Sequence, residues 1–256
     1  MNSKLKLCIT YICTGKYNIF FKDFYESFKD NFCKEHDVTF AIITDSPNSY
    51  NQYKDCAVYN VQRYYNNDIN YIKFRKFRDI LIAEDYLETQ DYCFYINGNL
   101  RCNNKVTLDE LLDGKDQYAV YHSLFDIRTM PMYESLTKCK VSSAYFTAND
   151  RKLYPNYKYY QAGNFGATKY KFLQMCRFIE SARNFDLYYG YDRYIKWHDE
   201  TYYNKYINTL TKKNYDAINI LDGKKYLCTW LPQLKPYVKS CKMILVNKDQ
   251  EWQTQK

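Results

Sequence analysis

The run Trp197-His198-Asp199-Glu200 places acidic and aromatic side chains within four residues. Its ordinary interpretation is a helix start, because Asp199 can cap a helix and Glu200 is favoured by the positive end of the helix dipole. A carboxylate beside a Trp in a cleft could also stabilise a positive charge that develops on a sugar carbon. His198 and Glu200 make a poor metal site, because no second His stands at a matching spacing.

Two other segments combine amide or small side chains with aromatic neighbours. Asn-Gly-Asn at 97–99 follows an apolar run, and although Asn-Gly often forms a simple tight turn, the end of a buried strand also suits a ligand site. The segment 159–168 has Gln-Ala-Gly between aromatic residues. Small residues there allow a ligand to approach and sugars to pack on aromatic faces, or the loop needs Gly for backbone reasons.

Several common functional motifs are missing from the sequence. The glycine-rich phosphate-binding patterns and the Gly-x-Ser-x-Gly elbow do not occur. The three His give few candidates for a catalytic triad. Ten Cys occur without a Cys-x-x-Cys pair, which favours reduced core cysteines in a cytosolic protein over a zinc site or a disulfide framework.

Strands and helices are expected to alternate in the first hundred residues, which places the Asn-Gly-Asn turn at the carboxyl end of a strand. Alternation favours an α/β fold with a mostly parallel sheet that helices cover on both faces. Residues 103–160 look more irregular and could form the acceptor half of a cleft. The periodicity predicts strands over 4–12, 37–43, 56–61 and 92–96, and helices over 17–33 and 71–88.

The charge of the chain is +8, and nine Lys against four acidic residues follow from Thr209 onward. This excess suits a phosphate-bearing ligand, an anionic membrane face or nucleic acid. Nucleic-acid binding is disfavoured, because the aromatic residues follow core periodicity and no nucleic-acid-binding motif occurs. No run approaches the roughly 18 apolar residues that span a bilayer, and the N-terminus lacks the apolar core of a signal peptide. We therefore expect a cytoplasmic protein.

In order and spacing, these segments resemble glycosyltransferase family 6, which includes the histo-blood-group A and B transferases, the α-1,3-galactosyltransferase and the Forssman synthase. The resemblance extends along nearly the whole chain, and the combination of signatures is more specific than any one of them. The matching segments are Tyr11 to Tyr17, Asn97-Gly98-Asn99, Val120-Tyr121-His122, Tyr133-Glu134, Ala144-Tyr145, Gln161-Ala162-Gly163, Trp197-His198-Asp199-Glu200 with Asn204-Lys205-Tyr206, and Val246-Asn247-Lys248.

The resemblance implies a GT-A fold, a Rossmann-like sheet flanked by helices, in a single domain over 1–256. The nucleotide-binding half would be about 1–100 and the acceptor and catalytic half about 101–256. It also implies retention of the α configuration, with Glu200 as the catalytic carboxylate, through either a covalent intermediate or front-side attack. His122, Trp197 and Thr229 would contact the acceptor, although Thr229 stands where blood-group enzymes have an Asp. The implied donor-binding residues are Tyr11, Cys13, Tyr17, Arg75, Lys76, Asn97, Asn99, Gln161, Ala162, Gly163, His198, Asp199 and Lys248.

The Asn-Gly-Asn turn departs from the animal members, whose Asp-x-Asp carboxylates hold Mn²⁺ against the diphosphate. The amides of Asn97 and Asn99 are poor ligands for a hard dication, so no metal and no other cofactor is expected, as in bacterial members that carry Asn-x-Asn. The resemblance implies a uridine diphosphate (UDP) sugar as the donor, so another positive charge must then stabilise the departing UDP. Lys248 is the first candidate, and Arg75 or Lys76 the second, unless their segment is an ordinary solvated helix face.

The absence of a side chain at Gly163 would leave room for an N-acetyl group, which favours UDP-N-acetylgalactosamine over UDP-galactose. An enzyme that uses UDP-glucose is a rival hypothesis. By resemblance, the acceptor is a galactose-containing glycan, with fucosylated H-antigen-like structures as the family-based candidate, reached in α-1,3 linkage. Animal members carry a transmembrane anchor; this sequence instead fits a bacterial or phage enzyme that acts on an oligosaccharide or a lipid-linked glycan, with peripheral contact to the inner membrane face.

Overall fold

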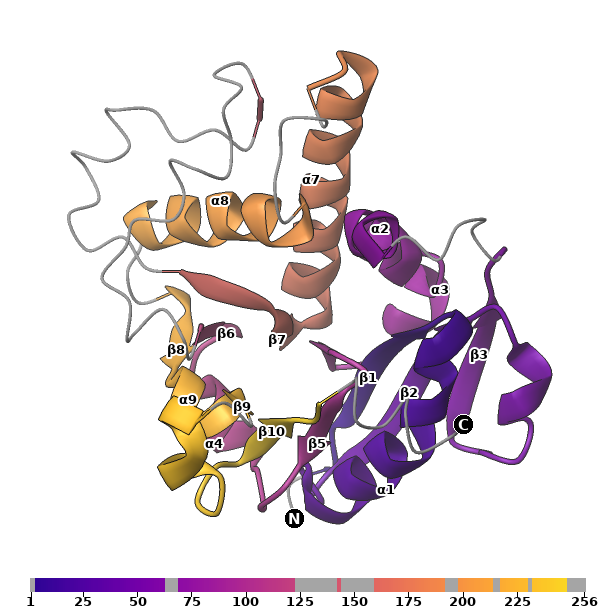
Figure 1. Cartoon of the computed structure of the whole chain (residues 1–256), viewed down its shortest axis with the longest axis vertical. Helices are drawn as coiled ribbons and strands as arrows, with labels where there is room; N and C mark the ends of the chain where they lie inside the picture. Colours follow the sequence, from indigo (N-terminus) through magenta and orange to yellow (C-terminus); the bar gives the residue numbers. More distant parts are fainter. Residues whose placement is uncertain are drawn as a thin grey trace.

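The protein has an α/β architecture in which helices pack on both faces of a large twisted sheet (Figure 1). The computed structural model describes residues 3–62, 69–122, 142–143, 159–191, 198–213, 217–229 and 232–247. The strands are β1 (Lys6–Cys13), β2 (Asp37–Thr44), β3 (Cys56–Asn60), β4 (Tyr92–Ile96), β5 (Leu100–Cys102), β6 (Gln117–Tyr121), β7 (Tyr160–Thr168), β8 (Asn219–Leu221), β9 (Cys228–Thr229) and β10 (Met243–Leu245). The α-helices are α1 (Phe21–Asn31), α2 (Ile69–Leu81), α3 (Glu84–Leu87), α4 (Leu108–Leu112), α7 (Lys169–Tyr188), α8 (His198–Lys213) and α9 (Gly223–Tyr226), and the 3-10 helices are η1 (Gly15–Phe20), η2 (Pro47–Tyr50) and η5 (Pro232–Tyr237).

The large sheet has the strand order β3-β2-β1-β4-β7-β6-β8. Strand β7 is antiparallel to both of its neighbours, and the other pairings are parallel. The α/β, mostly parallel fold predicted from the alternation of strands and helices is therefore confirmed. A second sheet of order β5-β10-β9 joins the chain just after the Asn-Gly-Asn turn to residues 241–247, called the C-terminal segment below.

Alternate residues of β1 pack into two separate cores, because successive side chains of a strand point to opposite faces. Leu7 and Ile9 lie in the core under α1, beside Phe24. Cys8 lies in the other core, together with residues of α2, α7 and α8. Burial on both faces is typical of a parallel sheet covered by helices. In such sheets ligands bind beyond the carboxyl ends of the strands, which here directs attention to the ends of β1 and β4.

The structure corrects four of the expected elements. The segment 159–168, for which a loop was one interpretation, forms the strand β7, paired with β4 and β6. The helix predicted over 71–88 is interrupted between α2 and α3, and the one predicted over 17–33 begins as a 3-10 turn, with the α-helix starting at Phe21. The interval 103–160 is not wholly irregular, since it contains α4 and β6. Thr107 caps α4 by accepting a hydrogen bond from the Glu110 N–H at 3.2 Å. Among the described helices, none has the length and apolar composition needed to cross a bilayer.

Candidate active site

The site is assembled where β4 ends beside β7. The backbone N–H of Asn97 donates to the Gly163 carbonyl at 2.8 Å, so the Asn-Gly-Asn turn lies directly against the Gln-Ala-Gly segment. The register of β4 and β7 places Ile96 opposite Asn164. Two segments more than sixty residues apart in the sequence thus form one wall of the site.

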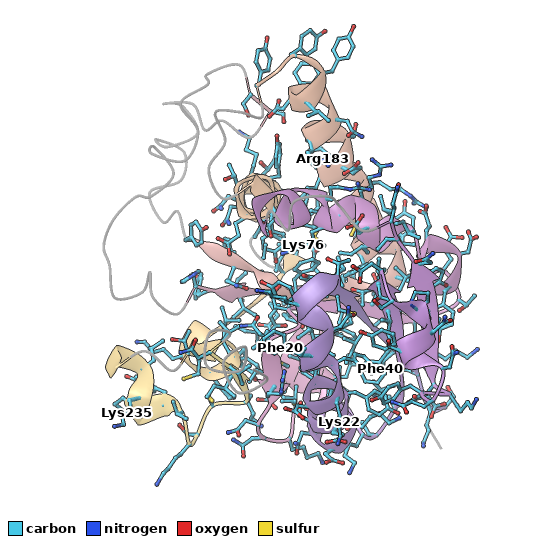
Figure 2. The ribbon with its side chains drawn as sticks, turned by 45° about the vertical axis from the view of Figure 1, so that its right-hand side comes forward. Phe20, Lys22, Phe40, Lys76, Arg183 and Lys235 are labelled. Carbon is cyan, nitrogen blue, oxygen red and sulfur yellow. The ribbon has the colours of Figure 1, made fainter. Side chains whose placement is uncertain are left out.

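Lys76, which is labelled in Figure 2, contacts both this wall and the first turn of α8. Its Nζ lies 2.5 Å from Asp199 Oδ2 and donates to the Ala162 carbonyl at 2.6 Å. The ammonium group also lies 4.6 Å from the centre of the Tyr95 ring. Lys76 and Asp199 are each 5% exposed, so this is a desolvated ion pair that fixes the Asp199 carboxylate against β7.

Arg75, the neighbouring cation on α2, faces another partner. Its guanidinium lies 3.6 Å from the buried carboxylate of Asp79. Burial raises the pKa of Asp79 to about 6, although the nearby Arg75 favours the charged form. Arg75 and Lys76 are both buried, so the interpretation as a solvated helix face is wrong for these two cations, although Arg78 on the same helix is exposed. Both cations already have carboxylate partners within the protein.

Glu200 lies in the first turn of α8, beside Asp199, as the helix-start interpretation predicted. The Tyr159 hydroxyl donates a hydrogen bond to Glu200 Oε2. Asn204 then ties this turn to β7: its Oδ1 accepts from the Tyr160 N–H at 2.7 Å, and its Nδ2 donates to the Tyr160 carbonyl at 2.7 Å and the Glu200 carbonyl at 2.8 Å. This clamping role of Asn204 escaped the sequence analysis, although its position one helical turn after Glu200 was a signal.

The space in front of Gly163 is occupied by two amide side chains. A Cβ at this position would lie 2.3 Å from Asn97 Nδ2 and 2.5 Å from Gln161 Oε1. The Gly163 N–H also donates to Gln161 Oε1. The expectation that Gly163 simply leaves an open space therefore needs correction: the missing side chain first admits the amides of Asn97 and Gln161.

Asn99 points away from this pair, toward the C-terminal segment. Its Nδ2 donates to the Val246 carbonyl at 3.1 Å, and the Val246 N–H donates to the Asn99 carbonyl at 2.9 Å. Thr229 lies on the other side of the same segment, opposite Leu245 in the β9–β10 pair, and is 7% exposed. The second Asn of the turn is thus buried in a contact with the tail.

Two of the three donor-binding residues implied in the segment from Tyr11 to Tyr17 lie in the core. Tyr11 and Cys13 are fully buried. The Tyr11 hydroxyl donates to the Tyr17 carbonyl at 3.4 Å, and the Cys13 thiol lies 2.9 Å from the Tyr50 hydroxyl. Tyr17 is partly exposed, which makes it the better placed of the three to meet a ligand.

A carboxylate that the sequence analysis did not single out lies beside this segment. Asp45 follows β2 and accepts the Gly15 N–H at 3.1 and 3.0 Å, together with the Asn18 amide at 3.2 Å. The turn-forming residues after β2 were the available signal in the sequence. Their partners, however, follow the end of another strand, β1. The contacts fix the start of η1, where Tyr17 lies.

His122 lies next to the tyrosine that contacts Glu200. Its backbone N–H donates to the Tyr159 carbonyl at 3.0 Å, and the two rings meet edge to face at 5.5 Å. Burial lowers the pKa of His122 to about 4, so its imidazole is neutral at pH 7. The structure therefore brings a predicted acceptor residue and the predicted catalytic carboxylate together through Tyr159.

Some predicted positions cannot be placed. Trp197 and Lys248 lie outside the described residues, as do the signatures at 133–134 and 144–145, and the side chain of His198 is also outside them. Within the described residues, no three His, Cys, Asp or Glu side chains form a group that could hold a metal ion. The nine cysteines in this part of the chain are free thiols.

Comparison with known proteins adds an independent line of argument. The family described as Glycosyltransferase family 6 matches residues 1–254. The chain is also similar to the O-antigen biosynthesis glycosyltransferase WbnI of Escherichia coli, with 28% identity over 199 residues. That match covers 77% of this chain and 80% of the relative.

Proposed function

This chain belongs to glycosyltransferase family 6, and we propose that it transfers N-acetylgalactosamine from UDP-N-acetylgalactosamine, with retention, to a galactose-containing glycan in α-1,3 linkage. One observation carries the site assignment: the first turn of α8 holds the carboxylates of Asp199 and Glu200 against β7, with Lys76 and Tyr159 as their partners. Two acidic groups held against the same strand, beside small residues, suit the binding and activation of a sugar.

In this proposal Glu200 is the catalytic carboxylate. It stabilises the positive charge that develops on the anomeric carbon, as either the nucleophile of a covalent intermediate or an electrostatic partner in front-side attack. The Tyr159 hydrogen bond and the Asn204 clamp hold it in position before substrate binds. Asp199, oriented by Lys76, and His198 bind the hydroxyl groups of the donor sugar.

The residues of the Asn-Gly-Asn turn do not fit a divalent metal. Asn97 Oδ1 already accepts a hydrogen bond from the Tyr95 hydroxyl at 3.1 Å, and the Asn99 amide is held by Val246. Neutral amides in these contacts do not supply the charged oxygen ligands that a hard dication requires. We therefore propose metal-independent transfer. Because the charge of Lys76 is matched by Asp199, Lys248 is the proposed cation for the leaving diphosphate.

The donor choice rests on the amides around Gly163. An acetamido group has its own donor and acceptor, so it can exchange hydrogen bonds with Asn97 and Gln161 where any Cβ at 163 would crowd it. UDP-galactose is the alternative donor; its 2-hydroxyl carries its donor and its acceptor on a single atom and has a shorter reach toward the two amides. Both donors are compatible with the family.

The acceptor proposal draws on the relative and on His122. The printed name of the relative places it in O-antigen biosynthesis, which supports a surface glycan, free or lipid-linked, as the acceptor class. A lipid-linked acceptor would bring the enzyme to a membrane surface. Neutral His122, with Trp197 and Thr229, would contact the acceptor sugar, and a fucosylated galactose is the first structure to try.

The proposal is tested by transfer from UDP-N-acetylgalactosamine to 2′-fucosyllactose, in excess EDTA and then with added Mn²⁺. A parallel panel with UDP-galactose and UDP-glucose at equal concentration measures UDP release. Full activity in EDTA and a preference for the N-acetyl donor are expected. Activity that requires Mn²⁺ would refute the metal argument, and faster turnover of UDP-galactose would refute the donor choice. Product anomericity by NMR decides retention.

A further inference from the structure

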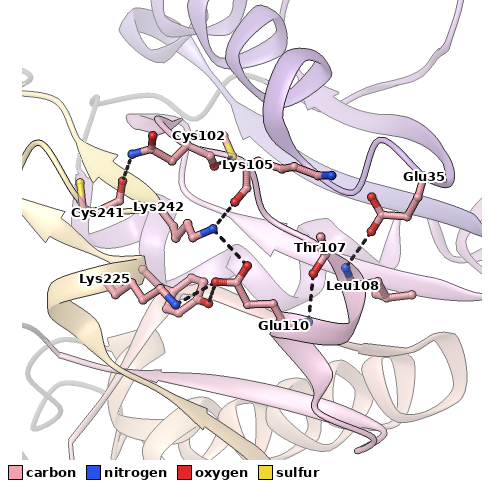
Figure 3. A network of polar contacts seen from close by, with 11 residues as sticks. Glu35, Cys102, Lys105, Thr107, Leu108, Glu110, Lys225, Cys241 and Lys242 are labelled. Atoms are coloured by element: carbon pink, nitrogen blue, oxygen red, sulfur yellow. Dashed lines mark hydrogen bonds and ion pairs between the residues drawn. The ribbon is translucent and has the colours of Figure 1, made fainter.

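The C-terminal segment is fixed along the small sheet by successive contacts. In Figure 3, Lys242 reaches Glu110, 3.2 Å away, and it also donates to the Lys105 carbonyl. Asn104 Nδ2 donates to the Cys241 carbonyl at 2.7 Å. From there β10 runs antiparallel to β5 as far as the pair of Leu245 and Leu100. The segment is thus held on one strand edge up to this point.

The next pair in the ladder is closed by a side chain. Val246 follows Leu245, and its N–H donates to the Asn99 carbonyl at 2.9 Å as a strand residue would. The return bond comes from Asn99 Nδ2, which donates to the Val246 carbonyl at 3.1 Å. Asn99 is only 6% exposed and Val246 is half-buried, so this exchange is partly shielded from water. A carboxylate of the same shape only accepts, and would set two acceptors against each other.

From this geometry we propose that Asn99 is a positioning residue, which anchors the C-terminal segment to the Asn-Gly-Asn turn rather than binding the donor itself. The pair with Val246 decides where the chain leaves the sheet, two residues before Lys248. The inference deepens the proposed function, because Lys248 is the cation assigned there to the leaving group. It gives the second Asn a role that depends on its amide donor, in addition to the loss of metal ligands.

The first test needs no substrate and measures hydrogen–deuterium exchange in peptides that contain 243–247. Asn99→Ala should raise exchange there about tenfold, since one hydrogen bond is lost. Asn99→Asp should raise it further, although Asp has nearly the shape of Asn. Asn97→Ala, at the other end of the same turn, is the control and should leave this peptide unchanged. Exchange at the wild-type rate in both Asn99 variants would overturn the proposal. Wild-type exchange in Asn99→Asp alone would also overturn it, because the shape of the side chain would then be sufficient without its donor.

The second test separates an anchor from a donor ligand. Deleting 247–256 and changing Asn99→Ala should each lower kcat more than they raise the donor KM, because Lys248 is assigned to charge that develops on the leaving diphosphate. If Asn99 acts through the segment, the combined variant should be no worse than the deletion alone. Effects that multiply would place the amide on the donor and refute the anchor. Loosened exchange in Asn99→Ala, with no donor turned over by the wild type, would support the anchor while refuting the proposed function.

Discussion

The two sides of the candidate site are built from different chemistry. At the start of α8, charged groups are matched inside the protein, Asp199 by Lys76 and Glu200 by the Tyr159 hydroxyl. At the Asn-Gly-Asn turn, by contrast, both side chains are neutral amides. Asn97 lies against Gly163, and Asn99 donates to the Val246 carbonyl in the C-terminal segment. The paired carboxylates are thus at the start of α8, whereas the side chains of Asn97 and Asn99 carry no charge and the neighbouring cation, Arg101, donates to the Gly98 carbonyl at 3.2 Å.

This difference indicates that the two sides of the site have different roles. A buried ion pair holds a single geometry and is costly to break, which suits carboxylates that must face a developing charge. Amides donate and accept in many arrangements, which suits a wall that, in the proposed function, admits the donor and then releases UDP.

Removing one partner of the ion pair should have the largest effect. Lys76→Met leaves the Asp199 carboxylate buried without its cation, and we expect a loss of about 3–5 kcal/mol in the free energy of unfolding. Urea unfolding monitored by circular dichroism measures it. Lys76→Met with Asp199→Asn should recover much of the loss, because no charge is then left unpaired. A loss below about 1 kcal/mol in the single variant would contradict the buried pair.

Glu200→Gln should abolish most transfer while the protein stays folded. The amide keeps the shape of the side chain but not its charge, so turnover should fall by about 10²- to 10³-fold. UDP affinity, measured by calorimetry, should change little. Glu88→Gln, which removes a surface carboxylate paired with Arg177, is the control. Near-normal transfer by Glu200→Gln would remove this residue from the mechanism.

Two glycines of β7 distinguish the adaptable wall from the core beneath it. An alanine Cβ at 163 would meet the ends of the Asn97 and Gln161 side chains, which can move, whereas one at Gly166 would lie 2.2 Å from the Phe94 ring. Gly166→Ala should therefore cost about 1–3 kcal/mol of stability by overpacking. Gly163→Ala should cost less and instead raise the donor KM. Thermal unfolding and donor titrations measure both, and the opposite ranking would contradict an adaptable wall.

His122 should give the smallest effect, visible as a pH dependence of stability. Its pKa is lowered to about 4 in the folded protein, below the ordinary value near 6.5, so the unfolded chain binds more protons between these values. Stability should therefore fall as the pH is lowered through this window. The loss between pH 7 and 5 should be smaller in His122→Gln. Buried Asp79 acts in the opposite direction, but equally in both proteins. Equal losses would show that His122 titrates normally.

Much of the fold could be predicted from local pattern. The alternation in β1, the short apolar runs of β2 and β4 and the helical spacing in α1 are all local signals, so these elements emerged without tertiary information. The break between α2 and α3 and the strand β6 did not, because β6 is a short segment stabilised by pairing with β7 and β8. The start of α8 next to Asp199 and Glu200 was predictable, since its signal lies in adjacent residues.

By itself, the sequence determined which chemical groups are present and in what order: two carboxylates at a helix start, two amides in place of acidic metal ligands, and glycines in β7. Only the tertiary structure decided their partners. Lys76 meets Asp199, Tyr159 meets Glu200, and Asn99 meets Val246, across separations of 123, 41 and 147 residues. Contacts of this range depend on how strands and helices close on one another. No local spacing in the chain encodes that closure.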